Sequence, residues 1–349
     1  MSEPTTQYIS SLDQAARAEV QSLLDRKTKP TGSLGRLEEL AVDLAGMRQG
    51  HRVLGSKVVL VAAGDHGVAA QGVSLYPSEV TGQMVLNYLS GGAAICVLAK
   101  RAGVRVLVVD AGVKAPPFAP HPDLVDARQG QGTADFSLGP AMTLEQAQAC
   151  LQAGRRIVAE LAGLGLGLLA LGEMGIANTT SAAALASALL GLDPEVVTGR
   201  GTGVGVEQRE HKVGVIRRAL DVNLPRAADP MDCLTKVGGF EIGVLAGAML
   251  EAASRRIPVV LDGFITGAAA LVAAALDPAL KGYLLASHKS QEVGHRHMLE
   301  HLGLRPYLNL DLRLGEGSGA ALFLPLVDAA LAIVDEMATF ESAGVSDKA

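Results

Sequence analysis

The sequence predicts an α/β protein with a doubly wound, mostly parallel, Rossmann-like sheet and a small helical subdomain. Two observations support this class. Short β-branched runs alternate with long stretches rich in Ala and Leu, which is the pattern of right-handed βαβ units. Hydrophobic residues form 49% of the 349-residue chain but aromatic residues only 3%. The core should therefore consist mostly of Ala, Val, Leu and Ile, as is usual where helices cover a parallel sheet.

The strands are predicted from short apolar runs that end at polar or glycine-rich turns. In chain order they are residues 57–63, 104–110, 166–172, 258–262 and 282–287, with 307–314 as a sixth candidate. In parallel sheets of this kind, ligands bind at the carboxyl ends of the strands. The turns after the strands are therefore the first place to look for a site.

The helical segments at the two ends of the chain predict the domain organisation. Residues 1–50 are helical and more charged than the rest, and a Pro/Gly-rich turn within them leads into an amphipathic helix. A similar charged helical stretch lies at 290–303. We expect a large α/β substrate-binding domain over 51–289, capped by a small helical subdomain formed by 1–50 together with about 290–340.

Composition excludes several classes of protein. The formal net charge of −6 and the lack of a block rich in Lys and Arg argue against a nucleic-acid partner. Cys96, Cys150 and Cys233 are too far apart for a disulfide framework or a metal knuckle, which suggests a reducing compartment. The N-terminus lacks a signal-peptide pattern, and the apolar run 161–172 is too short and glycine-rich for a membrane span. A cytoplasmic protein with no membrane partner is expected.

Carboxylates and histidines recur in the turns that follow the predicted strands. These turns read GDHG at 64–67, DAG at 110–112, GEMG at 172–175, DG at 262–263 and SHKS at 287–290. A purely structural turn would usually show glycine and mixed polar residues without this chemical preference. The pattern therefore predicts a site at the carboxyl edge of the sheet.

Asn178, Thr179 and Thr180 stand at the predicted start of a long helix rich in Ala and Leu. Uncapped N–H groups and the positive end of the helix dipole would suit an anion the size of phosphate. An ordinary N-cap is the alternative, since Asn and Thr are favoured there. Glu173 and the glycines beside it favour a site.

Glycines alternate with other residues in a second candidate loop, at Gly199, Gly201 and Gly203. Their spacing fits neither the dinucleotide fingerprint nor the P-loop. Such a loop could let backbone N–H groups approach a ligand, with Lys212 as a point charge for phosphate. A merely flexible loop is the alternative.

Three histidines, His295, His297 and His301, lie in the segment HRHMLEH. Two of them are four residues apart, a spacing that can bind zinc on a helix. The H-E-x-x-H pattern is absent, however, and the charged neighbours suit a solvated helix surface. We expect no metal.

Glu316 lies in the glycine-rich turn that opens RLGEGSGAALFLPLVDAAL, residues 313–331. Gly315, Gly317 and Ala320 match the G-x-G-x-x-A form of the dinucleotide fingerprint, but the required acidic residue at the end of a following strand is missing. A bound cofactor is therefore not expected. What remains is a carboxylate between two glycines, where the backbone can come close to a ligand. A surface acid or an acid at a helix start is the alternative.

Taken together, the long motifs resemble those of the nicotinate-nucleotide–dimethylbenzimidazole phosphoribosyltransferase family. They run in the family's order from about residue 29 to 330, which is far more specific than any single glycine loop. The motifs are KPTGSLGRLEELA, GDHGV, YPSEVT, GEMGIANTT, KVGGFEIGVLAGAMLEAASRRIPVVLDGF, SHKSQEVG and RLGEGSGAAL.

The resemblance implies that C1′ of nicotinate mononucleotide passes, with inversion, to a ring nitrogen of 5,6-dimethylbenzimidazole or a related base, giving α-ribazole 5′-phosphate. It also implies a homodimer. Glu316 matches the family's catalytic glutamate and Glu173 its second active-site acid. The expected phosphate residues are Gly175, Asn178, Thr179, Thr180, Lys212 and Ser290. The loop Gly199–Gly203 is expected beside the nicotinate carboxylate, and Asp262 and Gly263 at the same edge. The expected base pocket comprises Tyr76, Pro77, Gln83 or Met84, Leu314 and Gly315.

This chemistry fits the residues found independently. Nicotinate leaves from a positively charged pyridinium, so its departure needs no general acid and no metal. The incoming benzimidazole loses its N–H proton, which calls for a base with a pKa near neutral, and desolvation beneath an aromatic ring would raise the pKa of Glu316. Two alternatives stay open: a non-catalytic nucleotide-binding or regulatory protein on the same fold, and a nicotinamide-dependent oxidoreductase.

Overall fold

The computed structural model describes residues 8–199 and 205–346. Its strands are β1 (Ser56–Gly64), β2 (Arg105–Gly112), β3 (Leu124–Asp126), β4 (Leu166–Met174), β5 (Val259–Leu261) and β6 (Leu284–Ala286). Its α-helices are α1 (Gln14–Asp25), α2 (Arg36–Met47), α3 (Glu79–Leu89), α4 (Ala94–Arg101), α5 (Leu144–Gly163), α6 (Asn178–Leu190), α7 (Pro194–Val197), α8 (Val206–Asn223), α9 (Pro230–Val237), α10 (Phe240–Ser254), α11 (Phe264–Leu276), α12 (Val293–Leu302), α13 (Ser318–Glu336) and α14 (Phe340–Ala343). Two 3₁₀ helices, η1 (Gly67–Gln71) and η2 (Pro278–Tyr283), complete the described elements.

The six strands form one sheet in the order β3-β2-β1-β4-β5-β6, and every neighbouring pair is parallel. This confirms the predicted doubly wound α/β fold. The strand order reverses between β1 and β4, and a crevice forms at such a reversal because the two connecting helices leave on opposite faces. From Val58 onward β1 is buried on both faces, which explains its continuous apolar run.

The prediction of a sixth strand over 307–314 is wrong. The Tyr307 N–H donates to Ala286 O of β6 at 3.1 Å. Within the run, only Leu308 forms a β-bridge, an isolated parallel one to His288 beyond the end of β6. Its N–H donates to Ser287 O at 2.8 Å and its carbonyl accepts from Lys289 at 2.8 Å. The structure also contains β3, an edge strand of three partly exposed or exposed residues that is too short for a periodic signal.

Helices cover the sheet in a way that explains their composition. Helix α10 packs on α5 and contacts β1, β2, β4 and β5, and nearly all of its residues are buried. It is therefore apolar all round rather than amphipathic. Helices α3, α4 and α13 also pack on the strands.

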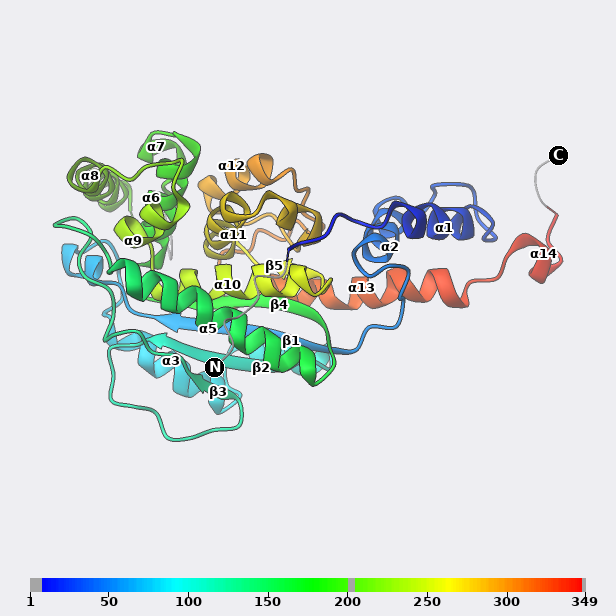
Figure 1. Ribbon diagram of the computed structural model, residues 1–349, viewed down its shortest axis with the longest axis horizontal. Helices are drawn as coiled ribbons and strands as arrows, with labels where there is room; N and C mark the ends of the chain where they lie inside the picture. Colours follow the sequence, from blue (N-terminus) through cyan, green and yellow to red (C-terminus); the bar gives the residue numbers. More distant parts are fainter. Residues whose placement is uncertain (1–7, 200–204, 347–349) are drawn as a thin grey trace.

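The elements from the two ends of the chain meet at one end of the molecule, where α1 and α2 pack beside α13 (Figure 1). Helices α6 to α9 gather at the opposite end. Helix α12 packs on α11, α7 and α6. The division into a large domain over 51–289 and a small helical subdomain stays a prediction.

In the part of the chain that the structure describes, two segments are long and apolar enough to cross a membrane by length and composition alone: Glu79–Arg101 and Ser318–Glu336. The first comprises α3 and α4 and the turn between them. The second is α13, which packs on β4, α2 and α4, and 56% of its most apolar window is buried. Packing inside the fold accounts for the apolar composition of α13.

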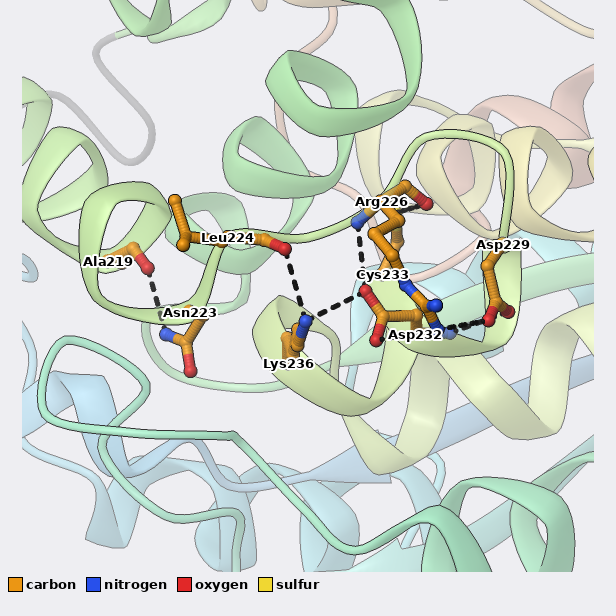
Figure 2. Close-up of polar contacts among 8 residues, drawn as sticks. All are labelled: Ala219, Asn223, Leu224, Arg226, Asp229, Asp232, Cys233 and Lys236. Carbon is orange, nitrogen blue, oxygen red and sulfur yellow. Dashed lines mark hydrogen bonds and ion pairs between the residues drawn. The ribbon is translucent and has the colours of Figure 1, made fainter.

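A polar network fixes the connection between α8 and α9 (Figure 2). Helix α8 ends at Leu224 in the left-handed conformation, and Lys236 donates to the Leu224 carbonyl at 3.1 Å and to Asp232 at 3.0 Å. Asp232 also accepts from the backbone of Arg226 at 2.8 Å, and Asn223 donates back to Ala219 O at 2.8 Å. These contacts hold the end of α8, the helix that carries Lys212.

Candidate active site

A cavity of about 340 Å³ opens at the carboxyl edge of the sheet. Its walls come from the segments that follow β4, β5 and β6, from the approach to α13, and from α3 and the residues before it. The residues that line it are Tyr76, Val80, Met84, Glu173, Met174, Gly175, Ile176, Asn178, Thr179, Gly263, Phe264, Ile265, His288, Ser290, Glu292, Arg313, Leu314, Gly315 and Glu316. Segments far apart in the sequence therefore meet where the fold predicts a ligand.

Glu316 lies in an unusual backbone loop. Gly315, Glu316 and Gly317 have φ values of 85°, 64° and 88°, so all three adopt the left-handed region. This region costs a residue with a side chain about 1 kcal/mol or more, and it persists at functional sites when the surroundings enforce it. The backbone of Glu316 also passes so close to Gly172 on β4 that a Cβ there would overlap it. Close backbone packing thus holds the loop against the sheet.

Asp262, just after β5, holds this loop by hydrogen bonds to its backbone. Its carboxylate accepts three backbone N–H groups at the start of α13, from Gly317 at 3.2 Å, Gly319 at 2.8 Å and Ala320 at 3.2 Å. Burial raises the pKa of Asp262, whereas His288 and these three N–H groups favour its charged form. Asp262 therefore satisfies the helix start that an exposed N-terminus would otherwise offer to a ligand.

The Glu316 carboxyl group is buried at the cavity wall. Burial raises its pKa above the usual 4.5, the Tyr88 hydroxyl opposes this rise, and the charge of Asp262 adds to it. Within the described part of the chain, Oε2 of Glu316 has no hydrogen-bond partner. The carboxylate is thus poised to accept a proton from a bound molecule.

Glu173, near the end of β4, is the second buried acid of the cavity. The amide of Asn178 donates to its Oε2. Burial raises the pKa of Glu173 to about 8, nearby Asp262 adds to the rise, and Asn178 opposes it. A Cβ at Gly315 would overlap Oε1 of Glu173, so glycine is needed where the Glu316 loop meets the end of β4. At neutral pH Glu173 mostly holds a proton.

Replacing Glu173 with Gln is expected to stabilise the protein most at alkaline pH. Between the ordinary value of 4.5 and about 8, the folded protein holds a proton that the unfolded chain has lost, so stability falls as pH rises through this window. Below pH 4.5 both the folded protein and the unfolded chain hold this proton, so burial of the Glu173 charge costs no stability there. The advantage of the Gln variant should therefore grow from pH 4.5 to 8, by on the order of a few kcal/mol, and then level off. Urea unfolding at several pH values tests this, and a constant difference between the two proteins would contradict it.

Lys212 does not line the cavity itself but forms a hydrogen bond to Thr179, which does. Its Nζ donates to Thr179 Oγ1 at 2.5 Å. Burial lowers the pKa of Lys212 to about 8, and the charge of Glu292 opposes this shift. Helix α6 starts after Ala177, a left-handed residue with φ 74°, and no side-chain cap is described for it. A buried cation and an uncapped helix start together suit an anion.

The structure brings most of the predicted site residues together. Those that line the cavity are Tyr76, Met84, Glu173, Gly175, Asn178, Thr179, Gly263, Ser290, Leu314, Gly315 and Glu316. Those that are described but do not line it are Pro77, Gln83, Thr180, Gly199, Lys212 and Asp262. Gly201 and Gly203 lie outside the described residues.

The predicted residues that do not line the cavity lie in different surroundings. Pro77 and Gln83 are exposed, whereas Thr180 is fully buried. Gly199 packs against Glu292, so closely that a Cβ there would overlap its carboxylate. Met84 rather than Gln83 lines the cavity, because successive side chains on α3 point about 100° apart.

Sequence reasoning missed several residues of the cavity. The polar ones are His288, Glu292 and Arg313, and the apolar ones are Val80, Met174, Ile176, Phe264 and Ile265. His288 carried a signal, because it stands in the SHKS turn after a strand. Met174 stands in the corresponding GEMG turn at 172–175. The others carried no such signal, since only the tertiary arrangement turns them toward the cavity.

The three histidines of HRHMLEH do not converge. His295 is buried and its Nδ1 accepts the Ser290 N–H at 3.1 Å, and burial lowers its pKa to about 3. His297 lies 3.7 Å from Glu300, and His301 is exposed. Among the residues described, no group of three or more His, Cys, Asp or Glu side chains could hold a metal ion.

Comparisons with known proteins agree on one family. The family described as "Phosphoribosyltransferase" matches residues 9–345. A nicotinate-nucleotide–dimethylbenzimidazole phosphoribosyltransferase of Chloroflexus aggregans is 52% identical over 345 residues, which cover 99% of this chain and 98% of the relative. The enzyme of that name from Roseiflexus sp. is also 52% identical over 345 residues, with the same coverage of both chains. The crystal structure of CobT from Thermus thermophilus matches with a TM-score of 0.92 and 49% identity, covering 96% of this chain and all of that one.

Proposed function

This chain belongs to the nicotinate-nucleotide–dimethylbenzimidazole phosphoribosyltransferase family, and on that premise we propose the substrates and the roles of its site residues. The enzyme is a pentosyltransferase of cobalamin biosynthesis. It transfers the phosphoribosyl group of nicotinate mononucleotide to 5,6-dimethylbenzimidazole or a related base. The products are nicotinate and α-ribazole 5′-phosphate.

The observation that carries the proposed mechanism is the buried Glu316 carboxyl group in the cavity wall, with no hydrogen-bond partner described for its Oε2. One benzimidazole nitrogen attacks C1′ while the other nitrogen loses its proton. Glu316 takes that proton as general base, and its raised pKa makes it a better acceptor than an ordinary glutamate. The bond from C1′ to the pyridinium nitrogen breaks, and its electron pair leaves with nicotinate as a neutral ring.

The geometry of substitution explains the change from a β to an α product. The base attacks C1′ on the face opposite the departing nicotinate, so the configuration inverts. The acceptor base lies against the apolar wall formed by Tyr76, Val80, Met84 and Leu314, next to Glu316. Protonated Glu173 donates a hydrogen bond to the nucleotide in the same cavity.

The 5′-phosphate binds at the start of α6, beside Thr179, Gly175 and Ser290. Lys212 supports this site by its bond to Thr179 and supplies the positive charge. The same chemistry needs no cofactor and no metal, because the leaving group departs from an already cationic ring.

The direct test is product formation from the two substrates. The protein is incubated with nicotinate mononucleotide and 5,6-dimethylbenzimidazole, and nicotinate and α-ribazole 5′-phosphate are measured by chromatography with mass detection. The anomeric proton in the NMR spectrum reports the α configuration. Release of nicotinate should require the base. Nucleotide binding by calorimetry without turnover would instead identify a non-catalytic nucleotide-binding protein.

The affinity for nicotinate mononucleotide should weaken as pH rises through about 8. Below that value Lys212 holds its proton and attracts the phosphate, and above it the free protein loses this charge. The dissociation constant should rise toward tenfold per pH unit above 8, and the Lys212→Met variant should bind weakly with no such rise. Because Glu173 also titrates near 8, calorimetry is done in the Glu173→Gln background. A pH-dependent rise that persists in the Met variant would contradict this role.

We also propose that the enzyme is a cytoplasmic homodimer. Sedimentation equilibrium at several protein concentrations tests the oligomeric state, and a single species of about 36 kDa would contradict the dimer.

A further inference from the structure

His288 is a cavity residue that the proposed mechanism leaves unused. Its ring is held between two glycine positions. On one edge Gly319 of α13 lies so close to Nδ1 that a Cβ there would overlap the ring. A Cβ at Gly263 would lie 3.6 Å from Cε1 and 3.7 Å from Nε2 of His288, and 3.7 Å from Cβ of Ser290. Gly263, His288 and Ser290 all line the cavity, and Nε2 is among the ring atoms that lie nearest to Gly263.

Ser287 contacts the Nδ1 atom of the His288 ring. Its hydroxyl donates to the backbone carbonyl of Asp262 at 3.3 Å. The same Oγ lies 3.0 Å from His288 Nδ1. With the hydroxyl proton on the Asp262 carbonyl, Oγ is the acceptor of this contact, which is compatible with a hydrogen on Nδ1.

The Asp262 carboxylate favours the same tautomer. Its Oδ1 lies 3.8 Å from Nδ1, where a ring N–H is attracted to the negative charge and a lone pair would be repelled. Burial lowers the pKa of His288 below its usual range, so the ring is neutral at physiological pH, although Asp262 opposes this shift. The Nε2 atom is consequently a bare lone pair at the cavity wall.

We propose that His288 Nε2 accepts a hydrogen bond from a ribose hydroxyl of the bound nucleotide and so positions C1′ for attack. This inference rests on the proposed function. A lone pair needs a donor, and the fully ionised phosphate and the nicotinate carboxylate have none. The N–H of the incoming base is directed to Glu316. The 2′ and 3′ hydroxyls are the donors that remain, and His288 thereby selects ribonucleotides over deoxyribonucleotides.

Substrate analogues that lack one hydroxyl test this contact directly. The values of kcat/KM are measured for nicotinate mononucleotide and for its 2′-deoxy and 3′-deoxy forms, with the wild type and with His288→Phe. The wild type should prefer the ribonucleotide over one deoxy form by roughly tenfold, the worth of one good hydrogen bond. The Phe variant should lose about tenfold on the ribonucleotide and almost nothing on that deoxy form. An equal loss on all three nucleotides, or an undiminished preference, would overturn the proposal.

Two further variants protect the test against a folding defect. His288→Gln keeps an amide oxygen as acceptor and should restore part of the preference. His295→Gln changes a second buried histidine, whose ring centre lies 6.2 Å from that of His288 and which does not line the cavity, and it should leave the preference unchanged. If the wild type turns over none of the nucleotides, the proposed function fails. Calorimetry with the ribo and deoxy forms then still measures the preference for the hydroxyl and tests His288 separately.

Discussion

The Glu316→Gln variant is expected to lose 10²- to 10⁴-fold in kcat, the usual contribution of a general base. Gln has nearly the same shape and can still lie in the left-handed loop at φ 64°, but it cannot accept the benzimidazole proton. Binding of nicotinate mononucleotide should therefore change little. Steady-state kinetics with both substrates, together with calorimetry for the nucleotide, separates these two effects.

The pH profile gives an independent check on this role. Only the ionised form of Glu316 is a base, so wild-type kcat/KM should rise with pH through a value above the ordinary 4.5. This acidic limb should disappear from the residual activity of the Gln variant. Glu300→Gln, which changes an exposed glutamate on α12, serves as the matched control and should keep the wild-type rate. Full activity in Glu316→Gln would show that another group takes the proton.

The Gly317→Ala variant is expected to lose both stability and activity. A Cβ at this position would lie 2.9 Å from Val59 Cγ1 and 3.2 Å from Gly172 Cα, and φ is 88°. The left-handed backbone costs Ala about 1–2 kcal/mol, and the overlap adds about 1–3 kcal/mol. Relief of the overlap would also move Glu316, and a displacement of about 1 Å can cost 10²-fold in rate.

Gly303→Ala is the matched control for Gly317→Ala. Gly303 also has a positive φ, 72°, but a Cβ there would meet nothing within 4 Å. Its substitution should cost only the backbone term of about 1–2 kcal/mol and leave kcat unchanged. Urea unfolding and kcat measured on both variants separate conformational strain from packing against the sheet. Equal losses of stability and equal rates would contradict the role of close packing at Gly317.

Indirect contacts explain why part of the site could not be predicted from sequence. Asp262 was expected beside the substrate, yet its carboxylate accepts the N–H groups at the start of α13. Lys212 does not line the cavity and donates to Thr179, which does. Both residues are separated in sequence from the groups they support, and a sequence pattern does not tell which of two polar residues faces the ligand and which one holds its neighbour.

The sequence by itself predicted the α/β fold and most strands of its sheet, the edge at which the cavity opens, and Glu316 as a residue of that edge. Strand and turn patterns are local, because β-branched runs and glycine-rich turns act over a few residues, and parallel strands bring their carboxyl ends together whatever lies between them. Glu316 was identifiable because its flanking glycines and the family motif lie within one short stretch.

Tertiary structure alone decided which side chains meet and how they ionise. The alternating run 307–314 resembled a strand, but only Leu308 of this run forms a β-bridge. The choice between Gln83 and Met84 depended on how α3 is rotated against the sheet, and the tautomer of His288 depends on Ser287 and Asp262. The pKa values of Glu173 and Lys212 both move toward 8 because distant segments exclude water from them. Desolvation is a property of the whole fold, so no local pattern in the chain can express it.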